Sequence, residues 1–275
     1  MRVAMAQVSS TADPSANLDA VRAGIADAAA HGADLVVFPE ASMCRFGVRL
    51  DTVAEPLDGQ WATAVRAAAV EQGIAVVVGM FTPGDIRGDR RRIRNTLLIV
   101  GADGNVEHYD KIHLYDAFGF AESDTVQPGS EPVTVTVTGE TVGVATCYDV
   151  RFPELFARLA DREARLIVLP ASWGAGAGKL EQWRLLTTAR ALDVQAWVVA
   201  VDQALPDDPD ASASSAPTGI GHSVLSSPHG VPIAEFGDGP ELRVFDIDLE
   251  EASAAREAMA VAANRRLQPT GPVQA

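Results

Sequence analysis

Cysteine is scarce in this chain of 275 residues, in which only Cys44 and Cys147 are present. Two cysteines are too few for a disulfide scaffold or for a zinc site of their own. Long apolar runs are also lacking, so nothing in the sequence predicts a membrane-spanning helix. The N-terminus runs directly into a strand-like pattern and lacks the apolar segment of a signal peptide. We therefore expect a cytoplasmic protein that has no membrane partner.

Positive charge is in short supply as well. The 22 Lys and Arg residues face 37 Asp and Glu residues, which gives a formal net charge of −15. Such a charge repels nucleic acids and anionic lipids, so we expect neither as a partner. One basic cluster, at residues 87–94, is interpreted as a solvated loop between two strands. Only two basic residues are lysines, Lys111 and Lys179. Arginine supplies the positive charge almost everywhere else in the chain. These two lysines therefore either have roles that arginine could not fill or are present by chance.

Short apolar runs alternate with helical patterns along the whole chain, which indicates an α/β protein with mixed sheets. Strands are predicted at residues 3–8, 35–38, 74–80, 96–100, 106–109, 132–138, 142–146, 166–169, 196–201, 222–226, 231–236 and 242–247. Helices are predicted at residues 14–30, 61–72, 153–161, 180–193 and 250–262. A surface loop is predicted at 205–220. No linker or repeat divides the chain, so we expect a single domain over residues 1–275.

Reactive side chains follow three of the predicted strands directly, where open α/β sheets place their active sites. Glu40 follows the apolar run 35–38, Lys111 follows 106–109, and Cys147 follows 142–146. A carboxylate is costly to bury at such a position unless it is paired or used in chemistry. A lysine there can stabilise a thiolate or an oxyanion. Each residue alone also has an ordinary interpretation, as a solvent-facing glutamate, a surface lysine or an inert buried cysteine.

Cys147 has the most informative surroundings of the three. Its strand runs straight into it, and the next helix is predicted to begin at Pro153, a residue favoured in a first helical turn. This order is typical of a nucleophile elbow, which exposes a reactive side chain beside backbone N–H groups. A nearby ammonium group can hold such a cysteine as a thiolate. His113 is a rival catalytic residue, or else a hydrogen-bonded structural histidine.

Taken together, three motifs resemble those of the carbon-nitrogen hydrolase (nitrilase-like) family. They are F-P-E ending at Glu40, K-I-H-L-Y-D beginning at Lys111, and C-Y-D-x-R-F-P-E beginning at Cys147. The resemblance extends over nearly the whole chain, as far as a G-H-S element within residues 221–230. It implies a four-layer α-β-β-α sandwich with mixed sheets, and a homodimer or larger homo-oligomer.

The resemblance also implies a role for each site residue. Glu40 would be the general base, Lys111 the cationic stabiliser and Cys147 the nucleophile. Glu122 matches a second glutamate that the family often carries after its lysine motif. The backbone N–H of Tyr148 would complete the oxyanion hole with Lys111. The mechanism implied in this way passes through a thioester and needs no metal or organic cofactor.

The implied substrate is a small amide. The motifs are most similar to the branch of ω-amidases and deaminated-glutathione amidases, which act on amides of small 2-oxo acids, and such substrates carry a carboxylate. Arg45 is our candidate to bind that carboxylate, Trp173 is a second candidate substrate-binding residue, and the glycine-rich loop at 174–179 is a candidate for the pocket wall. Gln182 stands before Trp183 where the most similar members often have His, which leaves these substrate contacts open.

Several other functions stay open at this point. Within the family, the alternatives are an N-carbamoyl amino acid hydrolase and then a nitrilase. A hypothesis from another class is a catalytically silent scaffold or regulatory subunit, although the presence of Glu40, Lys111 and Cys147 together argues against it. A third hypothesis is a Cys–His hydrolase of a different fold that uses His113 or His222.

Overall fold

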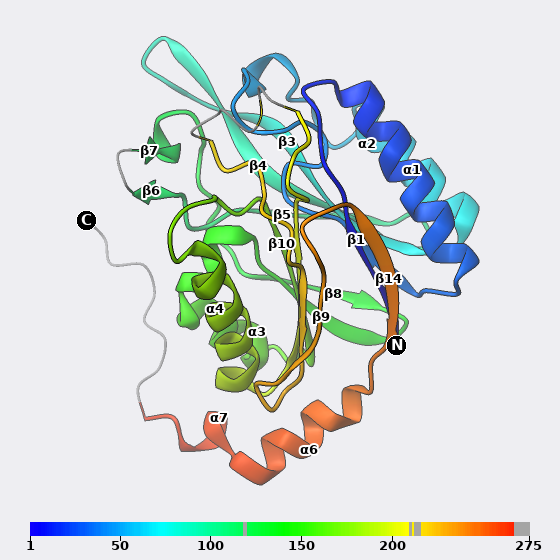
Figure 1. The fold of residues 1–275 in the computed structure, drawn as a ribbon, viewed down its shortest axis with the longest axis vertical. Coiled ribbons are helices and arrows are strands. Elements are labelled where there is room, and N and C mark those ends of the chain that lie inside the picture. Colours follow the sequence, from blue (N-terminus) through cyan, green and yellow to red (C-terminus); the bar gives the residue numbers. More distant parts are fainter. Residues whose placement is uncertain (118–119, 209–210, 212–215, 267–275) are drawn as a thin grey trace.

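Two six-stranded sheets form the centre of the computed structural model, which describes residues 1–117, 120–208, 211 and 216–266 (Figure 1). The first sheet has the order β14 (Glu241–Asp246), β1 (Arg2–Gln7), β2 (Leu35–Val37), β3 (Ala75–Arg87), β4 (Arg90–Val100) and β5 (Val106–Asp110). The second has the order β13 (Pro232–Glu235), β12 (Val224–Ser226), β11 (Trp197–Asp202), β10 (Leu166–Ala171), β9 (Glu140–Val144) and β8 (Val133–Val137). A short hairpin of β6 (Asp116–Ala117) and β7 (Phe120–Ala121) stands apart from both sheets.

Both sheets are mixed, with parallel strands at the centre and antiparallel strands toward the edges. β1, β2 and β3 run parallel to one another, and so do β9, β10 and β11. The neighbours of these strands pair with them in antiparallel fashion. The carboxyl ends of parallel strands meet at one edge of a sheet, which is where ligand sites form in such folds.

The two sheets pack face to face because each strand alternates its side chains between two apolar environments. In β1, Val3 and Met5 enter the core between the sheets, whereas Ala4 and Ala6 face the helices on the other side. Both faces are therefore buried, which explains why β2 reads as a continuous apolar run rather than an alternating one.

Helices cover the outer face of each sheet (Figure 1). α1 (Pro14–Ala30) and α2 (Gln60–Gln72) pack on the first sheet, and α3 (Pro153–Asp161) and α4 (Lys179–Val194) pack on the second. α6 (Leu249–Met259) and α7 (Val261–Asn264) follow the last strand. Single 3-10 turns are present at η1 (Leu50–Thr52), η2 (Glu122–Asp124) and η3 (Cys147–Arg151). These layers form the four-layer α-β-β-α sandwich that the sequence motifs implied.

Most predicted elements are confirmed within a few residues, but two need correction. The basic cluster is not a loop, because β3 continues to Arg87 and β4 begins at Arg90, so the cluster forms the tip of a hairpin. Residues 85–91 at this tip are exposed on both faces of the strands, so the alternation that sequence patterns detect is missing there. The predicted last helix is interrupted at Ala260, whose φ of 49° ends α6. The predicted loop at 205–220 lies partly outside the described residues.

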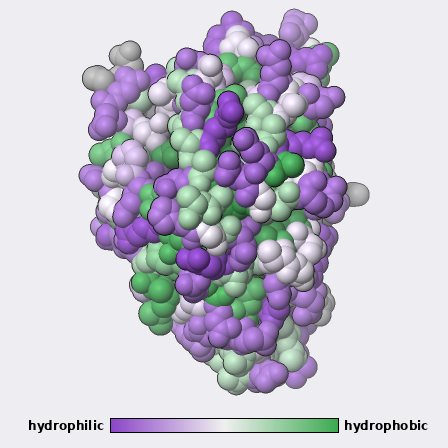
Figure 2. Space-filling model, turned by 90° about the vertical axis from the view of Figure 1, so that its right-hand side faces the viewer, coloured by the Kyte–Doolittle hydropathy of each residue, from purple (hydrophilic) through white to green (hydrophobic). Residues whose placement is uncertain are grey.

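The outer surface is mainly hydrophilic on the side of α1 and α2, with smaller hydrophobic patches between the polar residues (Figure 2). Within the part of the chain that the structure describes, no helix combines the length and apolarity needed to cross a membrane.

Candidate active site

Glu40, Lys111 and Cys147 lie close together in space although 107 positions separate the first from the last in the sequence. Glu40 lies just beyond β2, Lys111 directly follows β5, and Cys147 lies just beyond β9. The two sheets thus contribute opposite sides of one cluster. All three side chains are almost completely buried, with exposed fractions of 0%, 3% and 8%.

The loop that carries Glu40 is fixed by a close approach to β3. Gly79 donates its N–H to the Pro39 carbonyl at 3.1 Å and accepts from the Met43 N–H at 2.9 Å. A Cβ atom at Gly79 would lie 2.5 Å from the Ala41 nitrogen, so only glycine fits there. Glycine inside a strand often marks such a close backbone contact, and this signal was available in the sequence but not used.

Cys147 lies at the sharp turn between β9 and η3, as predicted for an elbow. Its φ is 45°, an unfavourable backbone conformation for a residue with a side chain. The turn is held by Asp149, which is completely buried. One oxygen of Asp149 accepts from the Thr146 N–H at 2.8 Å and the Tyr109 hydroxyl at 2.6 Å.

The other oxygen of Asp149 contacts His113. It accepts from the His113 N–H at 3.1 Å and lies 2.7 Å from Nδ1 of the same residue. The His113 ring stacks on Phe152 at 3.7 Å between centroids. His113 therefore braces the elbow. It is not among the residues that line the cavity beside Cys147. His222 pairs with Glu235 at 2.8 Å and does not line the cavity either, so neither histidine has the position a Cys–His mechanism requires.

Lys111 is held between two carboxylates. Its Nζ atom lies 3.0 Å from Oε1 of Glu40 and 3.0 Å from Oε2 of Glu122. Asn95, which sequence reasoning did not select, donates from Nδ2 to Glu40 at 2.7 Å and to Glu122 at 3.3 Å. The Tyr115 N–H donates to the second oxygen of Glu122 at 2.7 Å. Glu122 thus holds both the Lys111 ammonium group and the backbone at Tyr115, four residues further along the chain.

The second oxygen of Glu40 accepts from the Ser172 N–H at 2.9 Å. Ser172 immediately follows β10, and its carbonyl oxygen lies 3.8 Å from the Cys147 sulfur. The segment after β10 therefore contacts both the carboxylate and the thiol.

The pKa values in this cluster reflect burial and charge together. Burial raises the pKa of the Cys147 thiol well above its ordinary value, and the nearby Glu40 raises it further, while Lys111 opposes them. Burial would lower the pKa of Lys111, but Glu122 and Glu40 outweigh it and raise that pKa well above its ordinary value. The lysine is therefore charged and the resting thiol is protonated. The nucleophile needs a base at the moment of attack.

A cavity of about 570 Å³ opens beside the cluster. Glu40, Lys111, Glu122, Cys147 and Tyr148 lie on its wall. Aromatic side chains and two further cations also line it; among these lining residues are Tyr115, Arg151, Trp173, Gly174, Ala175 and Lys179.

Trp173 and the start of the glycine-rich loop lie on the cavity wall, whereas Arg45 does not. Arg45 donates to the Phe46 carbonyl at 3.3 Å and lies 3.6 Å from a carboxylate oxygen of Asp208. This position does not fit the contact with substrate that we expected, because a local acid already neutralises the guanidinium. Cys44 is buried outside the cavity, and burial raises the pKa of its thiol to about 11.

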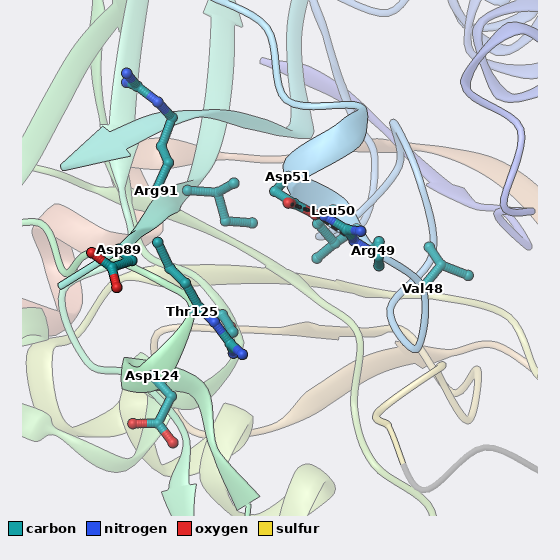
Figure 3. A pocket seen from close by; sticks show the side chains of 10 residues that line it. Val48, Arg49, Leu50, Asp51, Asp89, Arg91, Asp124 and Thr125 are labelled. Atoms are coloured by element: carbon teal, nitrogen blue, oxygen red, sulfur yellow. Dashed lines mark hydrogen bonds and ion pairs between the residues drawn. The ribbon is translucent and has the colours of Figure 1, made fainter. Parts of the chain in front are cut away.

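A second hollow of about 680 Å³ adjoins this cavity and shares Val48, Leu50 and Thr125 with it. Arg49 and Asp51, an ion pair at 2.6 Å, lie on one side of it, and Asp89 and Asp124 lie on the other (Figure 3). Its lining includes three arginines and three aspartates, so its charges balance. None of its lining residues belongs to the catalytic cluster.

No three His, Cys, Asp or Glu side chains are grouped as metal ligands within residues 1–117, 120–208, 211 and 216–266. Both cysteines are free thiols. The functional groups at this site are thus a thiol, two carboxylates and an ammonium group, set at the ends of strands from two mixed sheets.

Comparison with known proteins identifies the class to which this site belongs. The sequence model of the carbon-nitrogen hydrolase family matches residues 2–257. The chain belongs to the carbon-nitrogen hydrolase family and is an amidase-type hydrolase with a Glu-Lys-Cys triad.

Particular relatives place the chain more closely. It is 52% identical over 271 residues to hydrolase Rv0480c of Mycobacterium tuberculosis, which covers 96% of this chain and 95% of the relative. It is 32% identical to the deaminated glutathione amidase of Escherichia coli O157:H7, over 98% of each chain. The crystal structure of Saccharomyces cerevisiae Nit3, a nitrilase-superfamily member, superimposes with a TM-score of 0.81 at 28% identity, over 97% of each chain.

Proposed function

We propose that this protein hydrolyses the amide bond of a small, carboxylate-bearing amide through a thioester on Cys147. The observation that carries the proposal is the buried cluster of Cys147, Glu40 and Lys111, which lines a cavity together with the cations Arg151 and Lys179. Similarity to a deaminated glutathione amidase supports an acidic amide as the substrate.

The first half of the reaction forms the thioester. Glu40 accepts the thiol proton as the sulfur attacks the amide carbon, because the resting thiol is protonated. The oxyanion that develops is stabilised by the Lys111 ammonium and by the Tyr148 N–H, which lies in the first turn of η3 and so lacks an intrahelical acceptor. Glu40 returns its proton to the amide nitrogen, the C–N bond breaks, and ammonia leaves.

The second half releases the acid. Glu40, now a carboxylate again, takes a proton from a water molecule as that water attacks the thioester carbon. The C–S bond breaks and the sulfur regains the proton from Glu40, which restores the starting state. Glu122 touches no reacting atom in this scheme. It keeps Lys111 charged and in place through the contact at 3.0 Å.

The carboxylate of the substrate is proposed to bind Arg151 rather than Arg45. Arg151 ends η3, lines the cavity and packs over the Trp173 ring at 5.2 Å from its centroid. Its only hydrogen bond among the described residues is to the neutral Gln182 side chain at 2.7 Å. Within the part of the chain that the structure describes, no Asp or Glu pairs with this guanidinium, whereas Asp208 pairs with Arg45.

The proposal is tested by measuring ammonia release from 2-oxo-acid amides, N-carbamoyl amino acids, neutral aliphatic amides and nitriles. We expect turnover of the 2-oxo-acid amides, with kcat/KM at least about 100-fold above that of neutral amides, as one strong charged contact allows. Preference for N-carbamoyl amino acids would replace the proposed substrate class by the alternative one. A lack of turnover on the whole panel would favour the scaffold hypothesis.

A further inference from the structure

Lys179, one of only two lysines in the chain, lies on the wall of the catalytic cavity. It is the first residue of α4 and follows a loop in which Gly176 and Gly178 have φ values of 145° and 72°. The Trp173 indole N–H donates to the Lys179 carbonyl at 3.0 Å. The backbone of Lys179 is thus attached to the cavity wall.

The side chain of Lys179 reaches toward the same cavity. Its Nζ atom lies 3.4 Å from the Tyr115 hydroxyl and 5.5 Å from the centroid of the Tyr115 ring. The backbone of Tyr115 donates to Glu122, so this ring is tied to the catalytic cluster. The Tyr115 ring also packs edge-on against Tyr148, next to Cys147, at 5.0 Å between centroids. Tyr115 thus contacts both the Lys179 ammonium group and Tyr148, the residue after Cys147.

The charges around the cavity are divided into two groups. In the inner group, Lys111 neutralises one of the two carboxylates of Glu40 and Glu122. The other group consists of Arg151 and Lys179, both positive, and the described lining residues include no acid besides Glu40 and Glu122. This cationic wall stands out in a protein of formal net charge −15, whose overall field repels anions.

We propose that Lys179 is a specificity-determining residue, whose ammonium group binds the substrate carboxylate together with Arg151 and selects acidic amides over neutral ones. This inference rests on the proposed function and adds the residue that sets its charge preference. A lysine suits the position because its charge is compact and its stem is flexible.

The test compares succinamate with levulinamide, in which a methyl ketone replaces the carboxylate. Binding is measured by ligand-observed NMR titration in a Cys147→Ala background, so that the result does not depend on turnover. Adding Lys179→Met is expected to raise the Kd for succinamate about tenfold and to change the Kd for levulinamide less than about twofold. Unchanged levulinamide binding shows that the cavity stays folded.

Arg22→Met provides the matched control, since Arg22 is an exposed cation on α1 and its loss changes the net charge equally. It is expected to leave both Kd values within about 1.5-fold, since exposed charges act weakly. Equal effects of Lys179→Met on the two ligands, or no effect on succinamate, would overturn the inference. Failure of the proposed function is recognised separately, as absent turnover by the wild-type enzyme.

Discussion

Asp149 is expected to determine both the stability of the elbow and the activity, and Asp149→Asn tests this. The side chain accepts hydrogen bonds from the Thr146 N–H, the Tyr109 hydroxyl and the His113 N–H, at 2.8, 2.6 and 3.1 Å. Asparagine has one acceptor oxygen where aspartate has two. In either orientation its NH2 group faces one of the two backbone N–H groups, which then has no acceptor.

The size of the effect follows from burial. A buried N–H without an acceptor costs about 1–3 kcal/mol, and loss of a charged acceptor adds to this. We expect Asp149→Asn to lower the free energy of unfolding by about 2–4 kcal/mol. Activity should fall as well, because the φ of 45° at Cys147 persists only while its surroundings hold it.

The assay is urea unfolding, followed by circular dichroism, together with kcat under conditions where the variant is folded. Asp13→Asn is the matched control, because Asp13 caps α1 at the surface by accepting from the Ser15 N–H at 2.9 Å. Asparagine caps helices as well as aspartate does, so the control should lose less than about 0.5 kcal/mol. An Asp149→Asn variant as stable and as active as the control would refute this reasoning.

Other substitutions test other parts of the site. Glu122→Gln removes one of the two carboxylates that raise the pKa of Lys111, so the alkaline limb of the kcat–pH profile should move to lower pH. Burial raises the pKa of Asp202 from 3.8 to about 7, so its contribution to stability is complete below about pH 4 and is lost as the pH rises through about 7. The stability of wild type relative to Asp202→Asn, measured by urea unfolding, should therefore fall between about pH 4 and pH 7, by at most roughly 4 kcal/mol. Gly79→Ala should cost more than about 2 kcal/mol in the same assay and should lower kcat, because its Cβ would displace the loop that carries Glu40.

Much of the fold could be predicted because local patterns determine it. The apolar runs at 35–38 and 166–169 are strands buried on both faces, and the sandwich buries them between helices and a second sheet. The strand–turn–helix order around Cys147 predicted the elbow, and α3 has the predicted bounds. The tip of the β3–β4 hairpin escaped prediction, because residues 85–91 are exposed on both faces and leave no apolar side to alternate with a polar one.

The site was harder to predict where contacts cross long sequence distances. Asn95 contacts Glu40 and Glu122 from the middle of β4, and no motif marks such a residue in a single sequence. Arg45 stands close to Glu40 in the sequence, which made it a reasonable candidate, but it pairs with Asp208 instead. Arg151 reaches the cavity because of the path that the chain follows through η3 after Cys147. The sequence pattern did not specify this path.

The central claim is that Cys147 is the nucleophile, and ammonia release by Cys147→Ala and Cys44→Ala tests it most directly. Cys44 is the other free thiol and is buried away from the cavity, so its variant controls for the loss of a buried cysteine. The account predicts that Cys147→Ala loses turnover by at least about 10⁴-fold while remaining folded, and that Cys44→Ala keeps activity within about fivefold. Turnover that survives in Cys147→Ala would contradict the account.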